Sequence, residues 1–359
     1  MFTLSTNSGL AWRVSVTLFM KTVIKPLSHA ASAWVVLATV AGTAWGYDSR
    51  LHQDLTFIAA KELSLCQSRD DEVSQGRLTA LDTRYIVRAN VAEAASNLFT
   101  RMFRWNYYAP GDEPPKAAWG LIDTRFKNHV EQLIDSLRNN EQREERLKTF
   151  GRLLTYIQDV TSPAHVVPVF TTRWWRLSFY DRFDRYKIDA NRLADDDHDY
   201  CGRVHAVIAA QAKATDAGAV AGLLSATAEL TMRAVRAPID GFPARWSAYW
   251  QFAEREGDFG EYGPAGNTFG ERTRFRCGEG TQCLLLRNDP LYRDFAHSRH
   301  RDAVAATMEA MILLQNMALK QSIALKPNGP PTEARSALRP QGVRLKQGDA
   351  ASATPAADQ

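Results

Sequence analysis

The sequence lacks most of the short motifs that identify familiar enzyme chemistry. It has no Gly-x-Ser-x-Gly turn, which excludes the nucleophile elbow of the α/β-hydrolases. Its glycine-rich stretch 257–270 follows no strand and has no Lys-Ser/Thr ending, which excludes a phosphate-binding loop. It has four cysteines but no Cys-x-x-Cys pair, so a zinc ribbon is excluded, and it has no internal repeat. Any chemistry must therefore come from residues dispersed along the chain.

The first 44 residues carry three basic side chains and no acidic one. The apolar run 33–40 follows, and then the small residues 41–44. This order predicts a signal peptide that is cleaved before Trp45, and hence an exported protein, periplasmic or secreted. An uncleaved membrane anchor is the alternative, but the apolar stretch has about a dozen residues and a spanning helix needs about 20.

The charge balance excludes a broad nucleic-acid-binding surface. The 359 residues include 44 basic and 40 acidic side chains, and the predicted leader contains Arg13, Lys21 and Lys25. Without the leader, the excess of basic over acidic residues falls from four to one. We therefore expect no basic patch large enough to bind nucleic acid, and no nucleic acid as a partner.

All four cysteines lie in the predicted exported part, where an even number favours disulfides. Cys277 and Cys283 bracket a loop short and flexible enough to close, which leaves Cys66 with Cys201 by elimination. Four cysteines permit three pairings, and free buried thiols are the alternative.

Apolar residues recur at helical spacing through most of the mature chain, which predicts an all-α, multi-helix bundle. Such stripes run through 52–65, 86–103, 119–137, 147–160, 204–214, 217–235 and 303–325. Between 238 and 290 glycine, aromatic and cysteine residues replace the pattern, which predicts a long irregular insertion before the last helix. The domain boundaries that we expect are a leader at 1–44, one helical domain at 45–325 and a disordered tail at 326–359.

The end of the predicted helix 147–160 carries residues that suit a metal ion. Thr155 and Asp159 are one turn apart on one face. Pro163 stops the helix and frees the chain to bring His165 back toward Asp159. Carboxylates and imidazoles are zinc ligands. The alternative is that both residues have structural roles and bind no metal ion. Asp159 would then bond to amides in the last helical turn, and His165 would be a hydrogen-bonded loop residue.

Four residues together carry a family resemblance. Trp45 would be the mature N-terminus, His52 follows seven residues later, and Asp159 and His165 have the spacing of a central-helix motif. Over residues 45–190 the chain thereby resembles the zinc-dependent phospholipase C and single-strand nuclease superfamily. The resemblance implies a helical bundle in which three zinc ions at the base of a cleft polarise a phosphodiester.

The resemblance also implies a set of metal ligands. The residues implied for the first zinc are Trp45, through its amino nitrogen and carbonyl oxygen, His52 and Asp159. Those implied for the second zinc are His165 and Asp184. In this register Tyr180 stands where the family has a further histidine.

The third zinc of the family has poor counterparts in this chain. Ala94, Asn106 and Thr155 stand where the family has a carboxylate and two histidines. Neutral oxygen donors suit zinc poorly. Glu93 is adjacent to Ala94 and would substitute after a small helix rotation, so Glu93 and Asp159 are the candidate catalytic residues. The resemblance then implies fewer zinc ions than three, or none.

Two functions follow from the resemblance. The first is a metal-dependent phosphodiester hydrolase that acts on a phospholipid or a similar phosphodiester, with contact to a membrane surface. The second is a non-catalytic descendant that binds a lipid head group or a protein partner, and the replaced zinc ligands favour it. We expect no ligand role for His129, His198 or His205, and His129 continues an apolar stripe that predicts a core position.

Overall fold

The computed structural model describes a large part of the chain. The described residues are 48–69, 77–95, 107–108, 127–167, 169, 181–194, 199–211, 216–254 and 260–324. The side chains of 210–211, 216–217 and 318–324 are excepted. Trp45, Asn106, Tyr180 and His198 lie outside these ranges.

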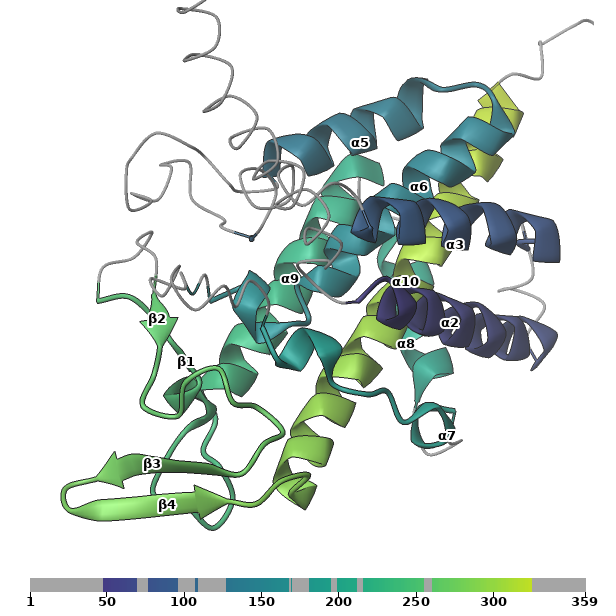
Figure 1. The fold of residues 1–359 in the computed structure, drawn as a ribbon. Coiled ribbons are helices and arrows are strands. Elements are labelled where there is room, and N and C mark those ends of the chain that lie inside the picture. The colour runs from purple at the N-terminus through teal and green to yellow at the C-terminus, as the bar shows by residue number, and fades with distance from the viewer. Residues whose placement is uncertain are drawn as a thin grey trace, which may run out of the picture. The chain divides into compact units, whose positions relative to one another are not determined.

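Eight α-helices make up most of the described chain (Figure 1). They are α2 (Ser49–Arg69), α3 (Ala80–Ala94), α5 (Lys127–Asn139), α6 (Arg143–Asp159), α7 (Ala190–Leu193), α8 (Tyr200–Gln211), α9 (Asp216–Arg236) and α10 (Pro290–Ala324). Three short 3-10 helices, Pro163–His165, Phe183–Arg185 and Trp246–Ala248, lie between them. The prediction of a mostly helical protein is confirmed.

Region 238–290, which the sequence predicts to be a long irregular insertion, contains two antiparallel hairpins, so the described chain is mostly and not entirely helical. Strands β1 (Trp250–Gln251) and β2 (Glu261–Tyr262) form the first, and β3 (Thr273–Gly278) and β4 (Thr281–Leu285) form the second. In β3, Thr273 and Phe275 are buried while Arg274 and Arg276 are exposed, which is the alternation of a strand with one covered face. The alternation is only four residues long, from Thr273 to Arg276, and is too short to stand out beside the helical stripes.

Helices α3 and α6 lie side by side in Figure 1 because a glycine allows them to approach closely. A Cβ atom on Gly151 would lie 2.3 Å from the carbonyl oxygen of Ile86, a distance that no real side chain tolerates. Asp82 fixes the N-terminal ends of both helices relative to each other. It completes a capping box with Thr79 at the start of α3 and accepts a hydrogen bond of 2.7 Å from Arg143 at the start of α6. This pairing sets the position of the last turn of α6.

Helix α10 is the central apolar element of the fold. Its buried residues occupy all sides between Ala303 and Leu314, as expected of a helix surrounded by others. It begins at Pro290, 13 residues before the predicted stripe. Proline suits the first helical position, and Asp289 accepts a hydrogen bond from the Leu291 amide at 3.1 Å.

Two disulfides are present, and both predicted pairings are confirmed. Cys66–Cys201 joins α2 to α8, with a Cα–Cα distance of 5.4 Å. Cys277–Cys283 joins β3 to β4, with a Cα–Cα distance of 5.8 Å. The alternative of free thiols is excluded.

Aromatic rings attach region 238–290 to the start of α10. The Phe183 ring lies 5.1 Å from Phe269, 5.9 Å from Trp250 and 5.9 Å from Phe295 on α10. Such edge-on contacts stabilise by about 0.5–1.5 kcal/mol each beyond the area that they bury. Phe183 precedes Asp184, so this cluster holds in place the short helix that carries a predicted zinc ligand.

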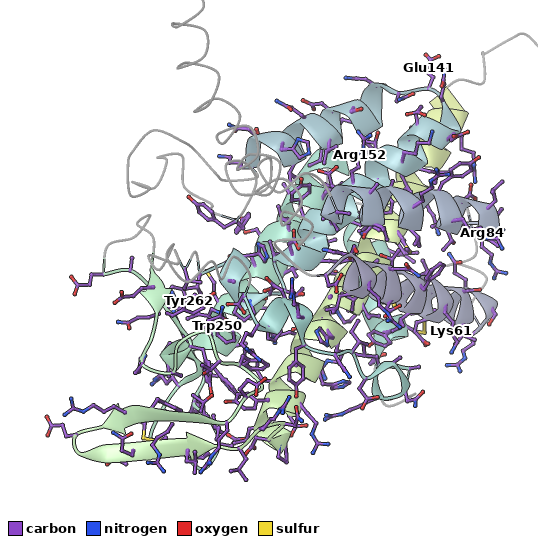
Figure 2. All side chains as sticks on the ribbon, in the orientation of Figure 1. Lys61, Arg84, Glu141, Arg152, Trp250 and Tyr262 are labelled. Carbon is purple, nitrogen blue, oxygen red and sulfur yellow. A yellow bond between two sulfur atoms is a disulfide. The ribbon has the colours of Figure 1, made fainter. Side chains whose placement is uncertain are left out.

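A buried carboxylate connects the same short helix to the first hairpin. Asp181 accepts hydrogen bonds of 2.8 Å from the Trp250 indole, the Tyr262 hydroxyl and the Phe183 amide. Figure 2 shows Trp250 and Tyr262 on the two paired strands. Burial and repulsion from Asp184 raise the pKa of Asp181 to about 6.

The chain divides into two units, residues Met1–Leu319 and Lys320–Gln359. In the described ranges, no helix has both the length and the apolar character that crossing a membrane requires. The predicted leader and tail lie outside those ranges, so their boundaries stay predictions.

We expect the two disulfides to differ in their effect on stability. Cys66–Cys201 closes 135 residues and Cys277–Cys283 closes six. In the chain-entropy model, replacing both cysteines of the first pair by serine costs about 5 kcal/mol of unfolding free energy and the same change in the second costs about 2 kcal/mol. Urea unfolding of the two double variants checks this, and a larger loss from the short loop would contradict it.

We expect His300 to make the protein sensitive to acid. Burial, with His297 and Arg299 nearby, lowers the pKa of His300 from 6.5 to about 3. The folded pKa lies below the unfolded one, so the neutral ring contributes its full stability above about pH 6.5 and loses it as the pH falls toward 3. Asp181, whose pKa is raised, has the opposite effect between its ordinary 3.8 and about 6.

The measurement compares urea unfolding of the natural chain and the His300→Gln variant. Between about pH 7 and about pH 4 the natural chain should lose about 3 kcal/mol more unfolding free energy than the variant. The contribution of Asp181 is common to both chains and cancels. Equal losses in the two chains would show that His300 is not the acid-sensitive group.

Candidate functional site

A buried amide side chain organises the candidate site. Gln158, in the last turn of α6, donates from Nε2 to Thr56 Oγ1 at 2.9 Å and to Thr307 Oγ1 at 3.1 Å. Its Oε1 accepts from Asn90 Nδ2 at 3.1 Å and meets His52 Nδ1 at 2.6 Å. All five side chains are buried, so each hydrogen bond is formed away from solvent.

This network determines which nitrogen of His52 carries the proton. The hydroxyls of Thr56 and Thr307 donate to the backbone carbonyls of His52 and Ala303, so both can accept from the Gln158 amide. The Gln158 oxygen must then face His52, and Nδ1 of His52 must be the donor. In the neutral ring, Nε2 therefore carries the lone pair.

Nε2 of His52 faces the Asp159 carboxylate. The distance from Nε2 to Asp159 Oδ1 is 3.3 Å, and both side chains are almost fully buried. Two electron-rich atoms this close attract each other only if a proton or a cation lies between them. A direct charge-assisted hydrogen bond would be about 2.7–2.9 Å long. Two ligands of one tetrahedral zinc, each at about 2.0–2.1 Å, lie about 3.3 Å apart.

A second pair of the same kind is formed by His165 and Asp184. The distance from His165 Nε2 to Asp184 Oδ2 is 3.6 Å, and both side chains are buried. Asp184 is oriented by Ser162, whose hydroxyl donates to the other carboxylate oxygen, Oδ1, at 2.6 Å. Pro163 opens the 3-10 helix that ends in His165, so the proline positions the imidazole beside Asp184.

Short backbone segments connect the two pairs. The Ser162 amide donates to the Asp159 carbonyl at 2.8 Å. The Asp48 amide donates to the Asp184 carbonyl at 3.1 Å, and the His52 amide donates to the Asp48 carbonyl at 3.1 Å. The start of α2, the end of α6 and the short helix around Asp184 are thus held together by backbone hydrogen bonds.

The donor chemistry of both pairs suits zinc, which prefers imidazole nitrogen and carboxylate oxygen. Over the described ranges, no group of three or more His, Cys, Asp or Glu side chains is arranged to hold a metal ion. Each pair would therefore need further ligands. Trp45, the predicted third ligand beside His52 and Asp159, lies outside the described residues, and its role stays a prediction.

The predicted third zinc position offers no such donors in the residues that the structure describes. Ala94 is buried, and the Thr155 hydroxyl donates to the Asn90 carbonyl at 3.2 Å. Thr155 thus serves to join α6 to α3. Asn106 lies outside the described residues.

Glu93 is engaged with two side chains on other helices. Its Oε1 accepts a hydrogen bond of 2.6 Å from the Tyr156 hydroxyl and lies 3.2 Å from His129 Nε2. Burial raises the pKa of Glu93, but the hydrogen bonds from His129 and Tyr156 outweigh it and keep the pKa below its ordinary value. Its predicted catalytic role stays a prediction, while His129, predicted to take a core position, also contacts this carboxylate.

Sequence reasoning missed Gln158, Asn90 and Ser162, which orient the predicted ligands. Only Ser162 had a local signal, since it precedes the proline that starts a new turn. The partners of Gln158 on other helices are between 68 and 149 residues away, and no spacing in the sequence relates them.

No protein-family model, no curated protein and no solved structure matches this chain. The geometry of the described residues therefore carries the functional argument. The superfamily resemblance stays an expectation that rests on the residues quoted for it.

We expect Gln158→Leu to destabilise the protein strongly. The change removes four hydrogen bonds and leaves the buried polar groups of His52 and Asn90 without this acceptor, which should cost at least about 3 kcal/mol of unfolding free energy. The matched control is Gln142→Leu at an exposed position before α6, with an expected change within about 0.5 kcal/mol. Urea unfolding of both variants is the measurement, and similar losses would contradict the role of the network.

Proposed function

We propose that the protein is an exported, zinc-dependent phosphodiester hydrolase of the phospholipase C and single-strand nuclease type. The observation that carries the proposal is the His52–Asp159 pair, in which a fixed tautomer directs Nε2 at a buried carboxylate 3.3 Å away. The buried His165–Asp184 pair supports it as a second place with zinc-type donors. The two disulfides agree with an oxidising compartment.

The chain's own residues would bind the zinc ions and orient the side chains that hold them. Gln158 holds His52, as an outer partner does for a metal-bound histidine, and Ser162 holds Asp184 in the same way. Burial of both pairs excludes water from the ligand atoms. When bound, zinc supplies Lewis-acid stabilisation of the charge that develops on a phosphate group. We place a phospholipid ahead of nucleic acid because the mature chain has an excess of only one basic residue.

The second candidate function is a non-catalytic descendant of that fold, which binds a lipid head group or a protein. The replaced third site favours it, because Ala94 has no donor and the Thr155 hydroxyl is used by the Asn90 carbonyl. It differs from the first candidate in one measurable respect, since it requires no turnover.

Metal content and turnover of the exported chain test the proposal. After export, Edman sequencing should begin at Trp45, and elemental analysis should find at least one zinc ion per chain. His52→Ala and Asp159→Ala should each lose zinc and lower turnover of a chromogenic phosphodiester at least about a hundredfold. His205→Ala, at an exposed histidine of α8, is the control and should change neither.

The outcomes separate the two candidates. Zinc with turnover that depends on Asp159 supports the hydrolase, whereas zinc without turnover supports the binding descendant. A correctly cleaved chain that binds no metal overturns the zinc proposal.

A further inference from the structure

A basic pocket lies beside the candidate metal site and is not used by it. The pocket has a volume of about 1040 Å³, which is at the upper end for a small-molecule site. Its described lining comes from residues 182–192, the turn after Phe269, the turn after β4, and the first turns of α10. It begins at Arg182 and includes Arg185, the residue after Asp184.

Cationic side chains outnumber acidic ones in this lining by six to three. The cationic residues are Arg182, Arg185, Lys187, Arg192, Arg287 and Arg293. The acidic residues are Asp189, Glu271 and Asp294. The described lining, with both histidines taken as neutral, therefore has an excess of three positive charges in a chain whose mature form is nearly balanced.

The acidic groups of the pocket are already engaged. Glu271 pairs with Arg182 and with Arg287, the latter at 3.4 Å, so one carboxylate serves two guanidinium groups. Asp294 pairs with Arg192 at 2.7 Å. The remaining carboxylate, that of Asp189, caps α7 by accepting from the Arg192 amide at 3.1 Å.

Two cations of the pocket are available to a ligand. In the described part of the chain, Lys187 and Arg293 form no ion pair with an acidic side chain, and both are exposed at the pocket. Arg293 lies near the Tyr186 hydroxyl, where its charge opposes the effect of burial on the Tyr186 pKa. Tyr186 and Phe269, with ring centroids 5.2 Å apart, form an apolar wall next to these charges.

We infer that this pocket binds a phosphorylated polyol, either as a soluble molecule or as the head group of an anionic lipid. Arginine binds phosphate oxygens through paired N–H groups, and a phosphate monoester carries about −1.5 to −2 charges, which suits an excess of three positive charges better than a single carboxylate does. The volume leaves room for the polyol, and the aromatic wall gives it a surface to contact. The inference does not depend on zinc at the neighbouring site.

Binding of two probes to the mature chain tests the inference. Calorimetry with inositol hexakisphosphate measures the soluble form, and co-flotation with phosphatidylcholine vesicles, with and without phosphatidylinositol 4-phosphate, measures the lipid form. EDTA is present throughout, so that phosphate held by a metal ion does not contribute and the result is separate from the test of the hydrolase. Binding should weaken as the salt concentration rises.

The decisive comparison uses two charge reversals of equal size. Lys187→Glu with Arg293→Glu should weaken binding at least about tenfold, because both direct phosphate contacts are lost. Arg84→Glu with Arg88→Glu, at exposed positions of α3 that are not part of the described lining, should change it by no more than about twofold. Lys187→Ala with Arg293→Ala is a milder pocket variant, which removes the charges without adding new ones.

Each outcome of these binding measurements either supports the inference or overturns it. If the pocket variants, and not the α3 variant, bind inositol hexakisphosphate more weakly, the ligand is a soluble molecule. If the pocket variants lose binding to the vesicles but not to inositol hexakisphosphate, the ligand is a lipid head group. Equal loss in the α3 variant would show that only net charge matters, and no binding of either probe by the natural chain would also overturn the inference.

Discussion

The side chain of Gln158 joins four helices, and the candidate site depends on this contact. From α6 it reaches His52 and Thr56 on α2, Asn90 on α3 and Thr307 on α10. Because every partner is buried, loss of the amide would leave polar groups in a medium where they cannot find water. The same hydrogen bonds that hold the helices together therefore fix the tautomer of His52, so stability and site geometry have one cause.

The second pair depends on a different part of the chain. Asp184 follows Phe183, whose ring packs against region 238–290 and α10, and Asp181 bonds to both strands of the first hairpin. The irregular region thus acts as a support for one half of the candidate site. The lining of the basic pocket begins in the same short segment and includes Arg185, the residue after Asp184. One short stretch of chain serves both places.

How much the sequence predicts depends on the distance over which each signal acts. Helical stripes and the short cysteine loop are local signals, and the structure confirms a mostly helical chain and the Cys277–Cys283 pairing. The start of α10 at Pro290 also had a local signal, aspartate before proline, but the apolar stripe obscured it. The role of Gln158 was inaccessible because its partners are distant in sequence. The alternation in β3 was too short to compete with the helical pattern.

The contact at Gly151 has a further consequence, for the ancestry of the chain. A methyl group there would collide with the backbone of α3, so substitution of Gly151 is selected against for as long as the two helices pair. Seven residues later, Gln158 is constrained by four separate partners. A glycine, a glutamine seven residues on and an aspartate directly after it should thus outlast most of the surrounding sequence, and distant relatives should be recognisable by this spacing when overall similarity has vanished.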